Sequence, residues 1–302
     1  MRKILMAAAL LAPMLLASCD REPENGNLCG DAEMSLSPVC DGTKGYVDGN
    51  TLFEGENPRT IYLSAYNQTT KKNLFIGYTY RRSDDDGTWK NFIGETHEPF
   101  YWPLGAVVNF LAFSVGDGPA SVRMAGDARW SNSGNASSEV TLELNSLDLL
   151  QDDILYAVNS DCRVSAGSPE LSFRHAQALV EFIVDSEKEN VRVQDIKLKS
   201  VFVSGRLTLA NNYGTPTCKW DFPDDIGRVD YTLHPAEGLI PSGGLTMRLL
   251  LPSQQVLSST RAEITYEVPN ETSGTTVKTG GIEFGHSTWL SGESYSYHVH
   301  LK

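Results

Sequence analysis

Short catalytic and cofactor-binding motifs are missing from this chain of 302 residues. It contains no G-x-S-x-G nucleophile elbow, no H-E-x-x-H zinc motif and no phosphate-binding loop. Only five cysteines are present, with no C-x-x-C pair and no Cys/His spacing that suits zinc. An enzyme whose catalytic residues are scattered along the chain would also lack these short motifs, so their absence argues only weakly against an enzyme. We expect a protein that is not an enzyme and that carries no cofactor or metal.

Basic residues are scarce as well. The sequence has 25 Lys and Arg against 38 Asp and Glu, which gives a formal net charge of −13. Nucleic acids and anionic lipid surfaces attract proteins largely through basic residues, so we expect neither as a partner. The acidic balance suits a soluble surface outside the cytoplasm.

The N-terminal apolar run is too short to cross a membrane as a helix, which takes about 20 residues. It covers residues 4–17, follows Arg2 and Lys3, and leads through small residues to Cys19. This order is typical of a lipoprotein signal peptide, although an ordinary signal peptide with a chance cysteine is the alternative. We expect residues 1–18 to be removed and Cys19 to carry acyl chains that anchor the protein in a membrane. Two or three acyl chains give stable anchoring, whereas a single chain does not.

The cysteines beyond Cys19 leave the disulfide pattern open. Cys29, Cys40, Cys162 and Cys218 can pair in about three ways, and an exported protein can form disulfides. Cys29 and Cys40 are close enough in sequence to staple an N-terminal arm. Cys162 and Cys218 could equally be single buried thiols.

Alternation of apolar and polar residues is the dominant pattern in the rest of the chain. Residues 139–144, 205–209 and 294–301 alternate cleanly, and residues 107–113 form a nearly continuous apolar run. No segment sustains the 3.6-residue period of a helix. Short strands separated by turns rich in Gly, Asn, Pro and Ser are typical of β-sandwiches, so we expect an all-β fold of antiparallel sandwiches.

Breaker-rich segments suggest the domain boundaries. Residues 19–32 are polar and without period, which indicates a flexible tether. Residues 165–169 are small and breaker-rich and lie between two strand-like runs. We therefore expect an N-terminal domain over residues 33–168 and a C-terminal domain over residues 169–302, each near the usual domain size.

Two candidate metal sites are weak. His298 and His300 would share one face of the last strand, but no third ligand lies near them in sequence. The acidic run 84–86 precedes a glycine as in a calcium loop, yet it lacks the ligand spacing of such a loop. Solvated histidines and a hairpin turn are the better interpretations.

Aromatic residues offer a candidate glycan site. Trp89, Tyr101, Trp102 and Trp130 could form a platform on which sugar rings stack, with Trp89 and Trp130 as the main stacking residues. The alternative is that Tyr101 and Trp102 pack in the core where a strand begins. We favour this packing interpretation.

Three stretches carry a family resemblance. They are residues 100–114, beginning Phe-Tyr-Trp-Pro-Leu-Gly, residues 171–182, beginning Leu-Ser-Phe-Arg-His-Ala, and residues 289–297, beginning Trp-Leu-Ser-Gly-Glu-Ser. In this order and spacing, together with the Cys19 signal, the chain resembles the fimbrillin-like (Mfa-like) lipoproteins of Bacteroidales, the subunits of type V pili. The resemblance covers residues 30–302.

The resemblance implies two transthyretin-like β-sandwiches in tandem, exported as an outer membrane lipoprotein that is exposed at the cell surface. It also implies that an arginine-specific protease removes the lipidated arm and the first strand, here residues 34–39, in stalk subunits. A strand from the next subunit then fills the groove by β-augmentation, so other pilus subunits are the expected partners.

The chain departs from the stalk pattern in two places. The loop after residues 34–39 contains Lys44 and no arginine, and the next arginine is Arg59. Arg59 is therefore the first candidate for cleavage and Lys44 the second, although Arg59 could equally be an ordinary surface residue. The sequence also stops within the segment expected to be the last core strand, which fits a tip subunit that accepts a strand and donates none.

We therefore expect a non-enzymatic fimbrial subunit or pilus-like adhesin of the tip type, with an unidentified host or bacterial surface ligand. The first alternative is a surface glycan-binding lipoprotein that works beside a nutrient importer. The second is a base subunit that stays anchored through the lipid on Cys19.

Overall fold

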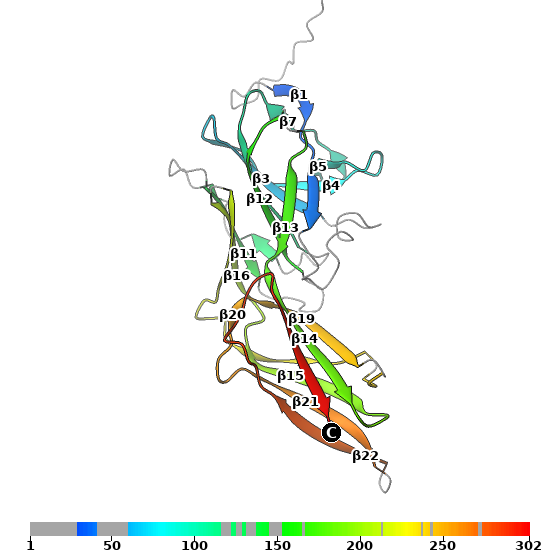
Figure 1. The fold of residues 1–302 in the computed structure, drawn as a ribbon. Coiled ribbons are helices and arrows are strands. Elements are labelled where there is room, and N and C mark those ends of the chain that lie inside the picture. Colours follow the sequence, from blue (N-terminus) through cyan, green and yellow to red (C-terminus); the bar gives the residue numbers. More distant parts are fainter. Residues whose placement is uncertain are drawn as a thin grey trace, which may run out of the picture.

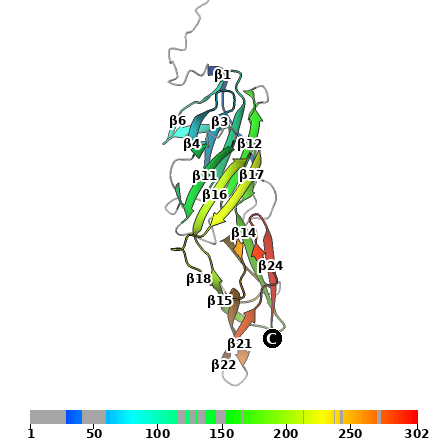
Figure 2. The same cartoon turned by 90° about the vertical axis from the view of Figure 1, so that its left-hand side faces the viewer.

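The computed structural model describes residues 29–40, 60–115, 122–124, 129–130, 137–144, 153–164 and 167–302, apart from residues 213, 237, 242–243 and 271–273. Over these ranges the chain consists of strands and turns without an α-helix, so the all-β expectation is confirmed. The described residues include no helix with the length and hydropathy that a membrane span requires. Figures 1 and 2 show an elongated molecule with β1 near one end and the β21–β22 hairpin at the other.

An eight-stranded sheet forms the upper half in Figure 1. Side by side, its strands are β2 (Ser37–Cys40), β13 (Glu170–His175), β12 (Leu155–Cys162), β8 (Val108–Ser114), β3 (Ile61–Asn67), β4 (Lys72–Arg82), β5 (Trp89–Ile93) and β6 (Thr96–His97). The pairing of β2 with β13 is parallel, and the other pairings are antiparallel.

The central strand β8 is buried on both faces of this sheet. Because successive side chains point to opposite faces, Phe110 lies in one apolar cluster and its neighbours Leu111 and Phe113 lie in another. We call the cluster with Phe110 the first core. It contains seventeen buried residues, among them Met34, Leu36, Leu63, Tyr80, Trp89, Trp102 and Phe173. The apolar run at residues 107–113 therefore predicted this doubly buried strand correctly.

The second core contains Leu111 and Phe113 and extends into the lower half of the molecule. A smaller sheet joins it, consisting of β10 (Arg129–Trp130), β11 (Ser137–Leu144), β16 (Gly205–Asn212) and β17 (Thr215–Asp221), with β9 (Val122–Met124) paired to β11. Asn211 of β16 donates to the backbone oxygen of Phe110 over 2.9 Å and so ties this sheet to β8.

The lower half holds the remaining large sheets. One contains β19 (Leu245–Pro252), β14 (Gln177–Ser186) and β24 (Ser294–Leu301), and the other contains β18 (Val229–Leu233), β15 (Arg192–Val201), β21 (Arg261–Asn270) and β22 (Gly274–Ile282). Two short pairs complete the fold, β20 (Gln254–Gln255) with β23 (Thr288–Trp289) and β1 (Cys29–Glu33) with β7 (Tyr101–Pro103).

Strands from both sides of residue 168, the domain boundary expected from the sequence, pair within the same sheets. β13 follows that point and pairs with β12 and β2 of the upper sheet. Only Ala176 separates β13 from β14, which belongs to the lower half, so the chain passes between the halves at this residue. The β16–β17 hairpin also pairs with β11 of the first half of the chain.

Candidate functional site

Residues 34–40 form a segment that closes the eight-stranded sheet, and we call it the closing strand. Its side chains alternate: Met34 is completely buried and Leu36 is 4% exposed, whereas Ser37 and Val39 point outward. Both buried side chains lie in the first core. Burial of an aliphatic side chain contributes about 1.5–3 kcal/mol, so these two residues hold the segment in place.

One side of the closing strand pairs with β13 in parallel. The register places Ser37 opposite Glu170 and Cys40 opposite Phe173. The Ser37 amide donates to the Pro169 oxygen over 3.0 Å, and the side-chain hydroxyls of Ser35 and Ser168 are 2.5 Å apart.

The other side of the closing strand contacts the far end of the same sheet. Leu36 forms an antiparallel bridge with Trp89, the first residue of β5. The neighbouring strand β6 pairs only with Phe92 and Ile93, so the Trp89 end of β5 is open to Leu36. The Met34 amide donates to the Phe100 oxygen over 2.7 Å. The closing strand thus lies between β13 and β5 and joins the two ends of the sheet.

Strand β1 leads into this segment from outside the large sheet. It pairs with β7 in an irregular register, with Cys29 opposite Pro103 and Glu33 opposite Tyr101. The Glu33 carboxylate also pairs with His97 of β6. The chain from residue 29 to residue 40 is therefore attached by backbone bonds and by the side-chain contacts Ser35–Ser168 and Glu33–His97, in addition to the buried side chains of Met34 and Leu36.

A buried ion pair lies at the end of the closing strand. His175 and Asp153 are both almost fully buried, with His175 Nδ1 2.8 Å from Asp153 Oδ1. Burial alone lowers the pKa of His175, but the interactions of the ring with Asp153 and with Cys40 outweigh it and raise the pKa to about 9. The last residue of the closing strand therefore contributes to the environment of a charged histidine.

The sequence offered only part of the signal for this pair. The Arg-His-Ala stretch at residues 174–176 is part of a family-like motif, but the sequence alone does not distinguish its histidine as a functional residue. Asp153 precedes β12 and His175 ends β13, so spacing in the sequence alone could not bring them together. The usable signal was the alternation within residues 170–175, which places His175 on the same inward face as Leu171 and Phe173.

Loss of the closing strand would expose both unpaired backbone groups and empty apolar pockets. The outer edge of β13 would present backbone donors and acceptors without partners, and the sites of Met34 and Leu36 in the first core would be empty. Such an edge beside apolar pockets is the arrangement that accepts another strand by β-augmentation.

The aromatic candidates separate into buried and exposed residues. Trp89 is 5% exposed and packs in the first core, which leaves its ring little area for stacking on a sugar. Trp102 is also buried in this core, whereas Tyr101 is 41% exposed. Trp130 pairs opposite Ser138 in β10, and its side chain lies outside the described part of the structure.

Several sequence candidates fall outside the described residues. Cys19, Lys44 and Arg59 belong to this group. The described chain resumes at Thr60, whose backbone oxygen accepts a hydrogen bond of 2.8 Å from the Ser114 hydroxyl.

The described cysteine side chains form no disulfide. Cys40, Cys162 and Cys218 are free thiols. Burial raises the pKa of both Cys162 and Cys218 to about 11. Both residues are therefore single thiols, as one of the two interpretations expects, but they are only partly buried.

The two weak metal candidates lie in ordinary surface interactions. His300 pairs with Asp185 at 2.5 Å and with Glu187 at 3.4 Å. Asp86 accepts from Lys90, and this side-chain hydrogen bond, with those from Thr88, holds the pKa of its carboxyl well below the usual range. Across the described part of the chain, no three His, Cys, Asp or Glu side chains gather in a way that could hold a metal ion.

Comparison with known proteins gives one family and a set of similar folds. A family described as fimbrillin-like matches residues 43–302. No curated protein matches the chain. A candidate cell adhesion protein from Bacteroides uniformis superposes with a TM-score of 0.53 at 14% identity, covering 89% of this chain and 94% of that chain.

Two further solved structures are similar. A candidate cell adhesion protein from Bacteroides ovatus has a TM-score of 0.53 and 14% identity, covering 89% of this chain and 92% of that one. A fimbrial protein from Bacteroides vulgatus has a TM-score of 0.52 and 8% identity, covering 88% of this chain and 95% of that one. At these identities the likeness concerns the fold.

Proposed function

This chain belongs to the fimbrillin-like family, and we propose that it is a fimbrial subunit or pilus-like adhesin whose closing strand is exchanged for a strand of another subunit. As a fimbrillin-like protein it is not an enzyme. The observation that carries the proposal is the position of residues 34–40, which lie between β13 and β5 with the buried side chains of Met34 and Leu36 anchored in the first core.

The exchange requires a cut between the closing strand and β3. Arg59 precedes Thr60 directly and Lys44 lies closer to the closing strand, so a trypsin-like or arginine-specific protease would cut at one of them. The cut turns the closing strand into a separate peptide. An incoming strand with apolar side chains at the positions of Met34 and Leu36 would restore both the backbone pairing with β13 and the packing of the first core.

The proposal also includes the division into two domains and the route of export. We regard the upper and lower halves as two transthyretin-like sandwiches, of which the upper carries the acceptor groove. Export as a lipoprotein through Cys19 would place the precursor at the outer membrane, with its arm still attached.

A tip position is supported by the last strand. β24 pairs with β14 over Ser294–Leu301, and Ser296 donates to Glu181 of β14 over 2.8 Å. Leu301 is buried at the end of this pairing. Because β24 is paired within its own chain, it would not be free to pair with another subunit. The subunit would therefore accept a strand but not donate β24. Antibody labelling should then find the protein at filament ends, and labelling along the shaft would argue for a stalk role.

Strand exchange can be tested with the full chain carrying a specific protease site inside residues 41–59. After cleavage, the N-terminal fragment should remain bound, and a labelled peptide of residues 29–40 should replace it over time. The matched control is the same peptide with Leu36→Asp, which places a charge in the first core and should not be incorporated. Absence of exchange, or equal incorporation of both peptides, would contradict the proposal.

A further inference from the structure

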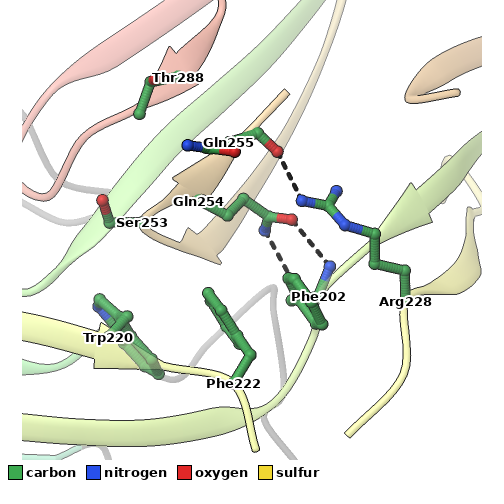
Figure 3. Close-up of a pocket in the computed structure, with 8 residues that line it drawn as sticks. All are labelled: Phe202, Trp220, Phe222, Arg228, Ser253, Gln254, Gln255 and Thr288. Carbon is green, nitrogen blue, oxygen red and sulfur yellow. Dashed lines mark hydrogen bonds between the residues drawn. The ribbon is translucent and has the colours of Figure 1, made fainter. Parts of the chain in front are cut away.

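A cavity of about 320 Å³ opens in the lower half, away from the closing strand. Figure 3 shows its lining, which comes from the chain after β15, from β17 and the residue that follows it, and from the β20–β23 pair. Three rings, one cation and two polar side chains matter for its chemistry: Phe202, Trp220, Phe222, Arg228, Gln255 and Thr288. The volume is at the lower end of the range found for small-molecule sites.

One wall of this cavity is aromatic. The rings of Phe202 and Phe222 are stacked with centroids 3.8 Å apart and planes inclined by 5°. Gly205 makes room for this pair, because a Cβ at that position would lie 3.1 Å from the Phe222 ring. Trp220 lies beside Phe222, and its indole nitrogen donates to the Ala176 oxygen over 2.7 Å.

The aromatic wall is held rigidly from behind. The amide of Gln254 accepts from the Phe202 backbone nitrogen over 2.8 Å and donates to the Phe202 oxygen over 2.9 Å. Gln254 itself is only 4% exposed. A ring fixed in this way loses little conformational entropy when a ligand packs against it.

Arg228 places a positive charge at the end of the wall. Its guanidinium carbon lies 4.5 Å from the centroid of the Phe202 ring. The guanidinium donates to the Ser200 oxygen over 2.8 Å, to the Gln255 oxygen over 2.7 Å and to the Thr260 hydroxyl over 3.3 Å. These partners are neutral, and none of the described carboxylates forms an ion pair with Arg228. Because a guanidinium has five donors, part of its capacity remains for a carboxylate.

Two polar side chains face the cavity from the opposite wall. Gln255 and Thr288 are cross-strand neighbours in the β20–β23 pair. Neither side chain forms a hydrogen bond with another group in the described part of the protein, and both residues line the cavity (Figure 3). An amide and a hydroxyl at this spacing can bind the hydroxyl groups of a ligand.

We propose that this cavity binds a sugar ring that carries a carboxylate, as in a uronic acid or a sialic acid. Because Phe222 and Arg228 cover the two faces of Phe202, the aromatic wall offers the apolar edges of its stacked rings to the C–H groups of the sugar. Gln255 and Thr288 bind the hydroxyls of the sugar, and Arg228 pairs with its carboxylate. The site would give the protein a glycan ligand at a place remote from the closing strand, and it does not depend on strand exchange.

Binding can be measured by calorimetry with the full chain and defined probes. Trigalacturonic acid and 3′-sialyllactose represent the two sources of the carboxylate, and carboxyl-reduced trigalacturonic acid and lactose are their neutral counterparts. We expect an acidic probe to bind about tenfold more tightly than its neutral counterpart, because one charge-assisted contact is lost. Tighter binding of one of the two acidic probes shows whether the ligand is a uronic acid or a sialic acid.

Variants separate the cavity from the rest of the surface. Phe222→Ala and Gln255→Ala should each weaken binding of the acidic probe about tenfold, whereas Thr276→Ala on the distant β22 strand should leave it unchanged. Gln255 is exposed, so its variant is expected to fold normally. The proposal is overturned if neither acidic probe binds, if neutral and acidic probes bind equally, or if Gln255→Ala binds like the unaltered chain.

Discussion

Leu36 forms an antiparallel bridge with Trp89, although Ser37, the next residue along the chain, is already paired with β13. A single short segment therefore joins strands that lie near opposite ends of the eight-stranded sheet. A strand in that position completes the sheet and seals the first core, and it leads toward Lys44 and Arg59, where we propose the cleavage. This relationship connects the fold with the proposed assembly of the fimbrillin-like protein.

The closing strand should owe its stability to its inward side chains. Leu36→Ala should lower the free energy of unfolding by roughly 2–5 kcal/mol, because it leaves a cavity in the first core. Val39→Ala, on the same strand with 40% of its side chain exposed, should cost less than about 1 kcal/mol. Urea unfolding of both variants measures the difference. Equal losses would mean that residues 34–40 are not anchored through the first core.

Stability should depend on the charge of His175. Its pKa is raised to about 9 in the folded protein from an ordinary value of 6.5, so the contribution of the charged ring is complete below about pH 6.5 and is lost as the pH rises through 9. Each unit of pKa shift is worth about 1.4 kcal/mol, which predicts a loss of roughly 2–3 kcal/mol over this interval. Unfolding curves at pH 6 and pH 9.5 provide the measurement.

Matched histidine variants identify the group that titrates. His175→Gln should flatten the pH dependence, because the charged ring is removed. His300→Asn should retain most of it, since His300 lies at the surface beside Asp185 and exposed ion pairs contribute little. A steep pH dependence that survives in His175→Gln would assign the effect to another group.

The attachment of the last strand can be tested at a buried hydrogen bond. The Trp289 indole nitrogen donates to the Tyr297 hydroxyl over 2.9 Å, and Trp289 is completely buried. Tyr297→Phe leaves this donor without its partner and should cost about 1–3 kcal/mol. Tyr101→Phe removes a hydroxyl from a partly exposed ring and serves as the control. Thermal unfolding that is unchanged in Tyr297→Phe would contradict the proposed role of this bond.

Thiol labelling should distinguish a buried cysteine from an exposed one. Burial raises the pKa of Cys218 to about 11, and the hydrogen bond with Ser291 acts in the opposite direction. At pH 8 its alkylation should be about a hundredfold slower than that of an exposed thiol, because only the thiolate reacts. Mass spectrometry of timed iodoacetamide reactions measures the rate, with the urea-unfolded chain as the reference. Labelling of Cys218 at the same rate in both states would show that it is not protected.

The sequence predicted strands better than it predicted their partners. The apolar run at residues 107–113 matches β8, and the alternation at residues 294–301 matches β24. Alternation of side chains states which residues share a face, because successive residues point to opposite sides of a sheet. It says nothing about which strand lies alongside.

The missing information concerns contacts between residues far apart in the chain. The pairing of the closing strand with β13 joins residues 37 and 170, and the pairing of β11 with β16 crosses the expected domain boundary. The cavity shows the same limit, since the stacked Phe202 and Phe222 lie on either side of a complete hairpin. Such arrangements depend on the packing of the whole core and leave no periodic signal in the sequence.

The central claim is that residues 34–40 are removed when the protein enters a filament. The most direct measurement is the intact mass of this protein recovered from shed surface filaments. The account predicts a mass for a chain that begins at Thr60, after cleavage at Arg59, or at Gly45, after cleavage at Lys44. A filament protein that still contains residues 34–40, with lipid on Cys19, would contradict it.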